Sequence, residues 1–186
     1  MKKVLMILLL VGGCCWRSPN AEFYMMKTPQ ETPLSTRKMV VAVADIKVPD
    51  LLNRQQMVIY DKDSNQVNIM EFNRWAEIFP DVVQGAIVND LMALLPDAYI
   101  KRSNFDSNRD DYNINVEINQ MITSGDVGAR LSVWWNVVNA KGKILLREQK
   151  VYEAGAESNN IQDLVQAQND VVNQLAKDIA SHLIKL

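Results

Sequence analysis

Two adjacent cysteines near the start of the chain are the residues best suited to covalent chemistry, because a thiol accepts acyl and alkyl groups. Cys14 and Cys15 are the only cysteines in the sequence, so the folded part of the chain has no disulfide and no thiolate metal site. A start with two lysines precedes an apolar run, Val4–Val11, which leads through two glycines to Cys14. This layout is typical of a secretory signal. The run is too short to span a bilayer as a helix, which takes about 20 residues.

The segment Val11–Cys14 resembles the signal of bacterial lipoproteins, in which an apolar residue and two small residues precede the cysteine that receives the lipid. Cys14 has Val11 three residues before it, which suits an apolar recognition pocket, whereas Cys15 has a glycine there. We therefore expect cleavage of a signal peptide of residues 1–13 and a covalent diacylglycerol and acyl chain on Cys14. Such chains anchor a protein stably when two or more are present. A conventional signal peptide that ends in Cys-Cys is the alternative.

The residue after the lipidated cysteine bears on which membrane holds the protein. In this class of lipoprotein an aspartate at that position tends to retain the protein in the inner membrane. Here the position holds Cys15, or Trp16 if the cut falls one residue later. The resemblance therefore implies anchoring in the outer membrane, with the folded domain facing the periplasm.

Length and charge favour one periplasmic domain, residues 23–186, on a short tether, residues 14–22. An extended chain covers roughly 3.3–3.6 Å per residue, so the tether reaches about 30 Å at most and keeps the domain at its own membrane. A mature chain of 173 residues can bury one core without disulfides or metals. Removal of the signal leaves 18 basic and 22 acidic residues. Nucleic acid is excluded as a partner, because its binding needs clustered Lys and Arg.

Two further patterns suggest a metal site or catalysis, and neither has the context that this chemistry needs. The calcium-loop positions 1, 3, 5 and 12 are held by Asp106, Asn108, Asp110 and Glu117. Position 6, where the sharp turn needs Gly, is Asp111, and the flanks alternate as strands do. His182 is the only histidine, with no motif that supplies a nucleophile and an orienting acid. We expect no metal site, no cofactor beyond the lipid on Cys14 and no catalytic residue, so the protein is predicted not to be an enzyme.

Hydrophobic periodicity predicts eight strands and two helices. The strands are expected at Phe23–Lys27, Met39–Val48, Met57–Tyr60, Val67–Glu71, Tyr99–Ile100, Tyr112–Asn119, around Leu131–Val137, and at Lys143–Tyr152. One helix is expected at about Asn73–Leu95, or from near Pro80, because proline suits a first turn better than a helix interior. The other is expected from a cap at Asn159 or Asn160 to Leu183. The last three strands read as an antiparallel meander. The predicted fold class is α+β: a single two-layer sandwich, a mostly antiparallel sheet with two helices on one face.

Alternation along the strand around Leu131–Val137 places two neighbouring tryptophans on opposite faces. Trp135 shares the core face with the apolar residues, and Trp134 lies opposite, with Arg130 and Asn136. An exposed aromatic beside an arginine is a candidate contact for a partner protein. The alternative is that Trp134 is covered by the N-terminal segment or packs at a sheet edge.

Five segments, in this order and spacing, resemble the family of ABC-type transport auxiliary lipoproteins, and the likeness covers nearly the whole mature chain. They are the lipid-acceptor motif ending at Cys14, Phe23-Tyr24, Ile46–Leu52, Arg74–Glu77 and Leu175–Ala180. One departure is Ile78-Phe79-Pro80, where family members often have Pro-Leu. This departure leaves the start of the first helix open.

The resemblance implies an accessory role in transport between two membranes. Such lipoproteins accompany MCE-type systems that carry phospholipids or other apolar molecules between the inner and outer membranes. This chain would be the outer-membrane component that docks an MCE-domain protein rooted in the inner membrane. No long apolar groove is evident, which favours an adaptor over a lipid carrier. A second copy of the chain is a further candidate partner. The alternative functions are a lipoprotein activator of a cell-wall synthesis enzyme and a structural component of another envelope assembly.

The anchor prediction separates the two cysteines. Cys14→Ala should leave an uncleaved or mislocalised precursor, because the lipid acceptor is lost, while Cys15→Ala should still be lipidated and sorted. Labelling of cells with an acyl-chain probe measures both outcomes. Label that persists in Cys14→Ala would move the attachment site to Cys15.

Overall fold

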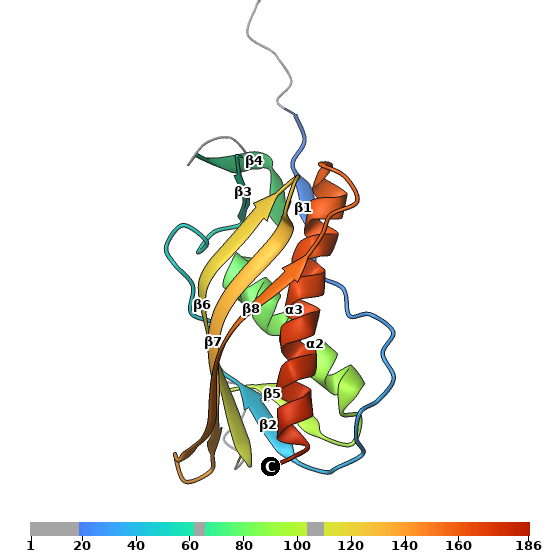
Figure 1. Ribbon diagram of the computed structural model, residues 1–186, viewed down its shortest axis with the longest axis vertical. Coiled ribbons are helices and arrows are strands. Elements are labelled where there is room, and N and C mark those ends of the chain that lie inside the picture. The colour runs from blue at the N-terminus through green and yellow to red at the C-terminus, as the bar shows by residue number, and fades with distance from the viewer. Residues whose placement is uncertain (1–18, 62–65, 104–109) are drawn as a thin grey trace, which may run out of the picture.

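The computed structural model describes residues 19–61, 66–103 and 110–186, and Figure 1 shows two long helices beside a curved sheet. Cys14, Cys15 and Trp16 lie outside the described residues, as do Asp106 and Asn108 of the calcium-loop pattern. The strands are β1 (Glu22–Tyr24), β2 (Val40–Val43), β3 (Gln56–Tyr60), β4 (Val67–Trp75), β5 (Tyr99–Arg102), β6 (Tyr112–Ser124), β7 (Gly128–Asn139) and β8 (Ile144–Ala154). The helices are α2 (Phe79–Leu94) and α3 (Ile161–Leu183).

The strands form two sheets, and the predicted α+β class is confirmed. The large sheet has the order β5-β2-β6-β7-β8, with β6, β7 and β8 forming the predicted antiparallel meander. The small sheet has the order β1-β4-β3, in which β3 and β4 form the predicted hairpin. Parallel pairs occur where β2 meets β5 and β6 and where β1 meets β4. Such pairs need long connections, here supplied by the chain between β2 and β5 and between β1 and β4.

The first helix does not begin at about Asn73, and its start lies next to Pro80, the other start that the sequence leaves open. Helical spacing of the aromatic residues suggested a start at Asn73, but β4 continues to Trp75, which pairs with Tyr24 of β1. The helix begins at Phe79, after Ile78 in an extended conformation. Pro80 falls in the first helical turn, where its missing N–H has no helical partner to lose. Arg74–Glu77 therefore ends a strand and does not open a helix.

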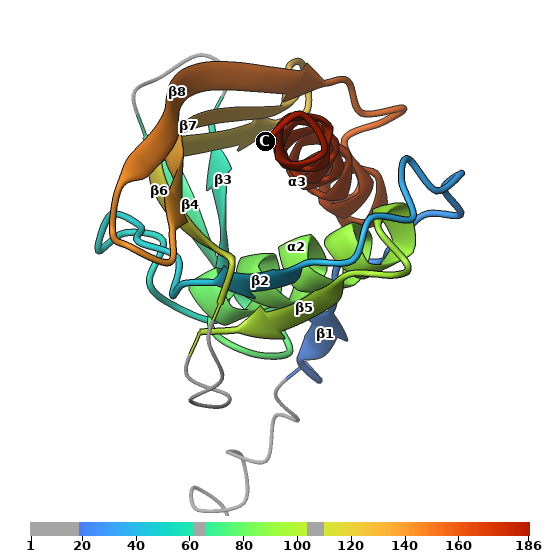
Figure 2. The ribbon, with the colours of Figure 1, turned by 90° about the horizontal axis from the view of Figure 1, so that it is seen from below.

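The core lies between the concave face of the large sheet and the two helices (Figure 2). The predicted inward residues of β7 are all at most 1% exposed: Leu131, Val133, Trp135 and Val137. They face α3, whose apolar stripe includes Leu175, Ile179 and Leu183, all fully buried. No helix in the described parts of the chain is long and apolar enough to cross a membrane.

Helix α3 has a side-chain N-cap, and the link between β1 and β2 is fixed along the same helix. The side chain of Asn160 accepts a hydrogen bond of 2.8 Å from the backbone N–H of Asp163, so Asn160, not Asn159, is the cap. The backbone N–H of Lys27 donates to Oδ1 of Asn169 at 2.9 Å. Further along the link, Glu31 pairs with Lys177 at 2.7 Å. The link thus runs along α3 as a packed segment.

A buried carboxyl group joins the two helices. The side-chain amide of Asn173 on α3 donates a hydrogen bond of 2.7 Å to Oδ2 of Asp90 on α2, and both residues are buried. Burial raises the pKa of Asp90 from 3.8 to about 6, and nearby Glu31 adds to the rise. A hydrogen bond with Thr28 and the charge of Lys177 oppose it in part. Above this pKa the helix contact therefore contains a poorly solvated negative charge.

Two truncations test the core. Trp75 is 2% exposed and packs on Phe79 with ring centroids 5.9 Å apart, while Leu175 is fully buried. Trp75→Ala and Leu175→Ala should each lower the free energy of unfolding by about 2–5 kcal/mol, because each leaves a cavity. Urea unfolding measures the loss. Phe72→Ala and Leu34→Ala, at positions 44% and 45% exposed, are the matched controls and should stay within about 1 kcal/mol.

The pH dependence of stability tests Asp90. An unfolded aspartate loses its proton near pH 4, whereas folded Asp90 keeps its proton to about pH 6, so the folded state binds more protons in this window. The free energy of unfolding should therefore fall as pH rises from about 4 to about 6. Asp90→Asn cannot ionise and keeps an acceptor for Asn173. Its Tm should exceed that of the wild type above about pH 6 and converge with it below about pH 4. A difference that stays constant across this range would contradict the assignment. Asp97→Asn, at an exposed position, is the matched control.

Candidate functional site

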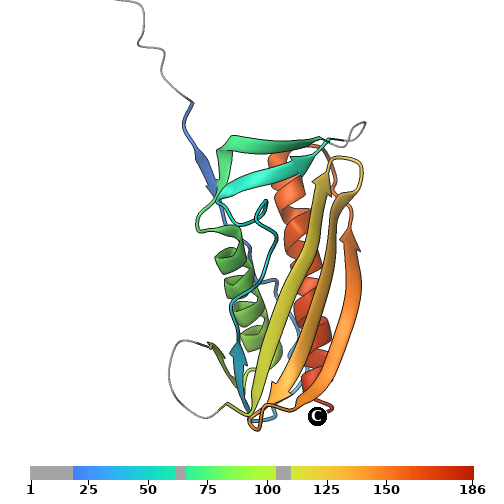
Figure 3. The same cartoon turned by 90° about the vertical axis from the view of Figure 1, so that its left-hand side faces the viewer.

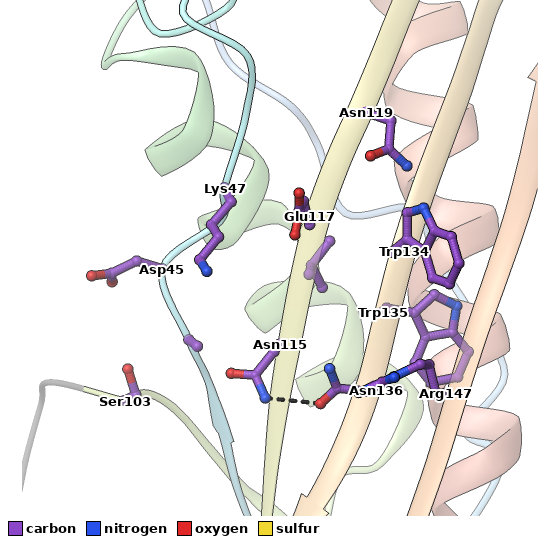
Figure 4. A pocket seen from close by; sticks show the side chains of 12 residues that line it. Asp45, Lys47, Ser103, Asn115, Glu117, Asn119, Trp134, Trp135, Asn136 and Arg147 are labelled. Carbon is purple, nitrogen blue, oxygen red and sulfur yellow. Dashed lines mark hydrogen bonds between the residues drawn. The ribbon is translucent and has the colours of Figure 1, made fainter. Parts of the chain in front are cut away.

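The outer face of the large sheet, opposite the helices, carries a groove of about 670 Å³ (Figure 4). We call it the outer groove. It is lined by Ala44, Asp45, Lys47, Ser103, Asn115, Val116, Glu117, Asn119, Trp134, Trp135, Asn136 and Arg147. One wall is the chain that follows β2, and the floor is the outer face of β6 and β7. Figure 4 shows Asn115 and Glu117 on β6 between Lys47 on one side and Trp134 on the other.

Strand register sets which side chains meet in the outer groove. Trp134 of β7 lies opposite Glu117 of β6 and opposite Gln149 of β8. In the next row on the outer face, Asn136 lies opposite Asn115. The side-chain amide of Asn115 donates a hydrogen bond of 2.9 Å to Oδ1 of Asn136. The first row thus has an aromatic ring between two polar side chains, and the second row is polar.

A β-bulge at Asn119 produces this register. Ser124 pairs with Gly128 at the hairpin end, and a regular ladder from there would place Trp134 opposite the core residue Ile118. The ladder shifts between Ile118 and Gln120, so Asn119 has no partner on β7. The extra residue restores the outward pairing of Trp134 and lets both Ile118 and Met121 be buried.

Trp134 lies where the alternation predicts, and neither alternative holds among the described residues. It is 42% exposed, while its neighbour Trp135 is 1% exposed. β7 is an inner strand, so Trp134 is not at a sheet edge. The described N-terminal residues 22–24 pair with β4 of the other sheet and do not cover it.

The three predicted contact residues do not all meet. Asn136 lines the outer groove with Trp134, but Arg130 does not. Arg130 lies four residues from Trp134 along β7, which is about 13 Å along a strand. It pairs instead with Glu153 of β8 at 3.3 Å, and both side chains are more than half exposed, so this ion pair adds little stability. Arg130 thus lies on the same outer face of β7 as Trp134 but outside the groove.

Sequence reasoning missed the basic residues that line the groove with Trp134. Arg147 of β8 lies opposite Asn136 and supplies the arginine that Arg130 does not. Lys47 follows β2 and lies along β6, where its carbonyl accepts from the N–H of Ile118 at 2.8 Å. The position of Arg147 could have been predicted by counting residues across the hairpin of β7 and β8. The position of Lys47 could not, because its pairing with β6 spans 70 residues of sequence.

A polar cluster on the inner side joins β8 to α3 around Asp178. The Lys150 ammonium and the Tyr152 hydroxyl each lie 2.7 Å from Oδ2 of Asp178. Burial by itself raises the pKa of Asp178, but the hydrogen bonds from Lys150 and Tyr152 outweigh it and hold the pKa below its ordinary value. Burial, with the nearby carboxylate, raises the pKa of Tyr152. His182 lies in the last turn of α3, with Nδ1 2.9 Å from the carbonyl oxygen of Asp178 and its ring edge-on to Trp135. These contacts fix α3 against the sheet.

The described members of the calcium-loop pattern have other surroundings. Asp110 pairs with Lys101 at 2.8 Å, and Glu117 lies on the outer face of β6 in the groove. Within residues 19–61, 66–103 and 110–186, no three His, Cys, Asp or Glu side chains are arranged to hold a metal ion.

Comparison with known proteins gives one family, and the solved structures with a similar fold include the following two. The family model described as "ABC-type transport auxiliary lipoprotein component" matches residues 24–180. An uncharacterized protein of known crystal structure is similar with a TM-score of 0.71 and 20% identity, covering 89% of this chain and 99% of that one. A DUF330 protein from Xanthomonas campestris is similar with a TM-score of 0.68 and 9% identity, covering 86% of this chain and 92% of that one. At these identities the two structures show the fold alone. No curated protein matches the sequence.

Proposed function

Because this chain belongs to the family of ABC-type transport auxiliary lipoprotein components, we propose that it is an outer-membrane lipoprotein that docks the MCE-domain protein of an intermembrane transport system. The family match over residues 24–180 is the observation that carries the proposal. Membership of this family supports the part of the proposal that describes a membrane-anchored accessory protein of a transporter. The outer membrane, the MCE partner and the docking role are the steps that we add.

The composition of the outer groove favours docking of a protein over carriage of a lipid. An acyl chain needs a continuous apolar lining to replace water. The groove instead exposes three side-chain amides, Asn115, Asn119 and Asn136, and charged groups of both signs. Amides of this kind donate to and accept from the backbone of a bound polypeptide. The groove therefore suits a protein segment.

Trp134 is the proposed anchor of that interface. Tryptophan and arginine are enriched among the residues that dominate binding free energy, and Trp134 and Arg147 line the same groove. Trp134 is held on an inner strand between β6 and β8, so little side-chain or backbone order has to be gained on binding. The site needs no catalytic group. Accordingly, the proposed role is that of an adaptor without enzymatic activity.

Capture of the periplasmic part of an MCE-domain protein tests the outer groove. Trp134→Ala and Arg147→Ala should each weaken binding by about 30-fold or more, which corresponds to the 2 kcal/mol of an interface hot spot. The Tm should not change, because both side chains are exposed on the sheet. Titration of the immobilised lipoprotein measures affinity, and a thermal melt of each variant measures stability.

Matched controls lie outside the groove. Arg130→Ala removes an exposed arginine from the same sheet face, and Tyr99→Ala removes an exposed aromatic from β5. Both should bind like the wild type. Wild-type affinity in Trp134→Ala with an intact fold would reject this face. A loss in Arg130→Ala but not in Arg147→Ala would move the contact along β7, and no binding by the wild type would reject the MCE partner.

A further inference from the structure

The small sheet closes the end of the molecule at which the N-terminal chain enters (Figures 1 and 3). β1 is its first strand, paired with β4 along Glu22–Tyr24. The turn between β6 and β7 reaches the same end of the molecule, as Figure 3 shows. We call this surface, the β1-β4-β3 sheet with the turn at residues 125–127, the end cap.

The end cap exposes apolar side chains that no described residue covers. Phe23 of β1 is 61% exposed, Phe72 and Ile69 of β4 are 44% and 38% exposed, and Val127 in the turn is 47% exposed. Single exposed apolar residues are ordinary on a protein surface. Four of them at one end of the molecule, from three separate segments, favour an apolar partner at that end.

The short distance in sequence between the lipid attachment site and β1 indicates that the partner of the end cap is the membrane. The chain belongs to a lipoprotein family, and Cys14 and Cys15 are its only cysteines, so the lipid is on one of them. Five residue steps separate Cys14 from Pro19, which allow a span of about 18 Å at most, whatever their conformation. β1 begins three residues after Pro19. The end cap is therefore held within a few tens of ångströms of the bilayer surface.

We propose that the end cap binds the phospholipid surface of the membrane in which the protein is anchored, with Phe23 and Phe72 inserted among the lipids. Phenylalanine is among the apolar side chains that membrane-surface proteins bury at the boundary between headgroups and acyl chains. The contact adds a second attachment beside the covalent lipid and fixes the orientation of the domain. The outer groove, built from the middle of β6 and β7, then stays clear of the membrane. This inference rests on lipoprotein membership and does not depend on the MCE partner.

Photocrosslinking of the full lipidated chain in vesicles of phosphatidylethanolamine and phosphatidylglycerol tests the contact. Benzoylphenylalanine in place of Phe23 or Phe72 keeps an aromatic ring at a site that is already exposed. Irradiation should add the mass of a phospholipid to the protein at either position. Benzoylphenylalanine in place of Tyr99 is the matched control, because Tyr99 is a 47% exposed aromatic on β5, towards the other end of the molecule. Its phospholipid adduct should be at least about 10-fold less abundant.

Each other outcome overturns the proposal. Equal lipid adducts at positions 23, 72 and 99 would mean that the domain tumbles freely on its tether. No lipid adduct at positions 23 and 72 would mean that the end cap faces away from the bilayer. Adducts between two protein chains instead of lipid would assign the surface to self-association. The vesicles contain no MCE-domain protein, so none of these results depends on whether that partner is correct.

Discussion

The two-residue alternation of side chains along β7 is the constraint on which both the core and the candidate site depend. Successive side chains of a strand point to opposite faces, so Trp135 enters the core because Trp134 leaves it. The inward set meets α3, and the outward set forms the floor of the outer groove. A slip of one residue would exchange the two faces, exposing the core residues and burying the polar ones. The same pairing that folds the domain therefore also defines its proposed binding surface.

Much of the fold was predictable because its strongest patterns are local. The stripe of α3, the meander of β6, β7 and β8, and the hairpin of β3 and β4 all follow from spacing within one or two neighbouring segments. The start of α2 was not predictable in this way. Trp75 and Phe79 are four residues apart, as on one helix face, and their rings do pack together. The contact instead joins the end of a strand to the start of a helix, and the pairing of Trp75 with β1 decides between the two.

The candidate site also has residues that local spacing predicts and residues that depend on pairing between separate segments. Trp134 and Asn136 follow from alternation within a single strand, and the structure places both in the groove. Arg147 depends on the register of a hairpin, and Lys47 depends on a segment that joins β6 from far away in the sequence. The bulge at Asn119 leaves a trace in the sequence, since the apolar residues Ile118 and Met121 are three apart where a regular strand would have two or four. Such a break in period marks a bulge but does not show which outward residues it aligns.

The pairing of β1 with β4 has a mechanical consequence for a protein held at one end by lipid. If a protein binds in the outer groove as proposed, tension between it and the membrane would enter the domain through β1. A pull along β1 loads its backbone hydrogen bonds to β4 together, in shear, instead of opening them one at a time. The Ala76 N–H bond to the Tyr24 carbonyl, 2.9 Å long, and the Lys27 bond to Asn169 carry the load on into the body of the fold. Under such a load, a strand of three residues would be the joint through which the domain resists being drawn away from its membrane.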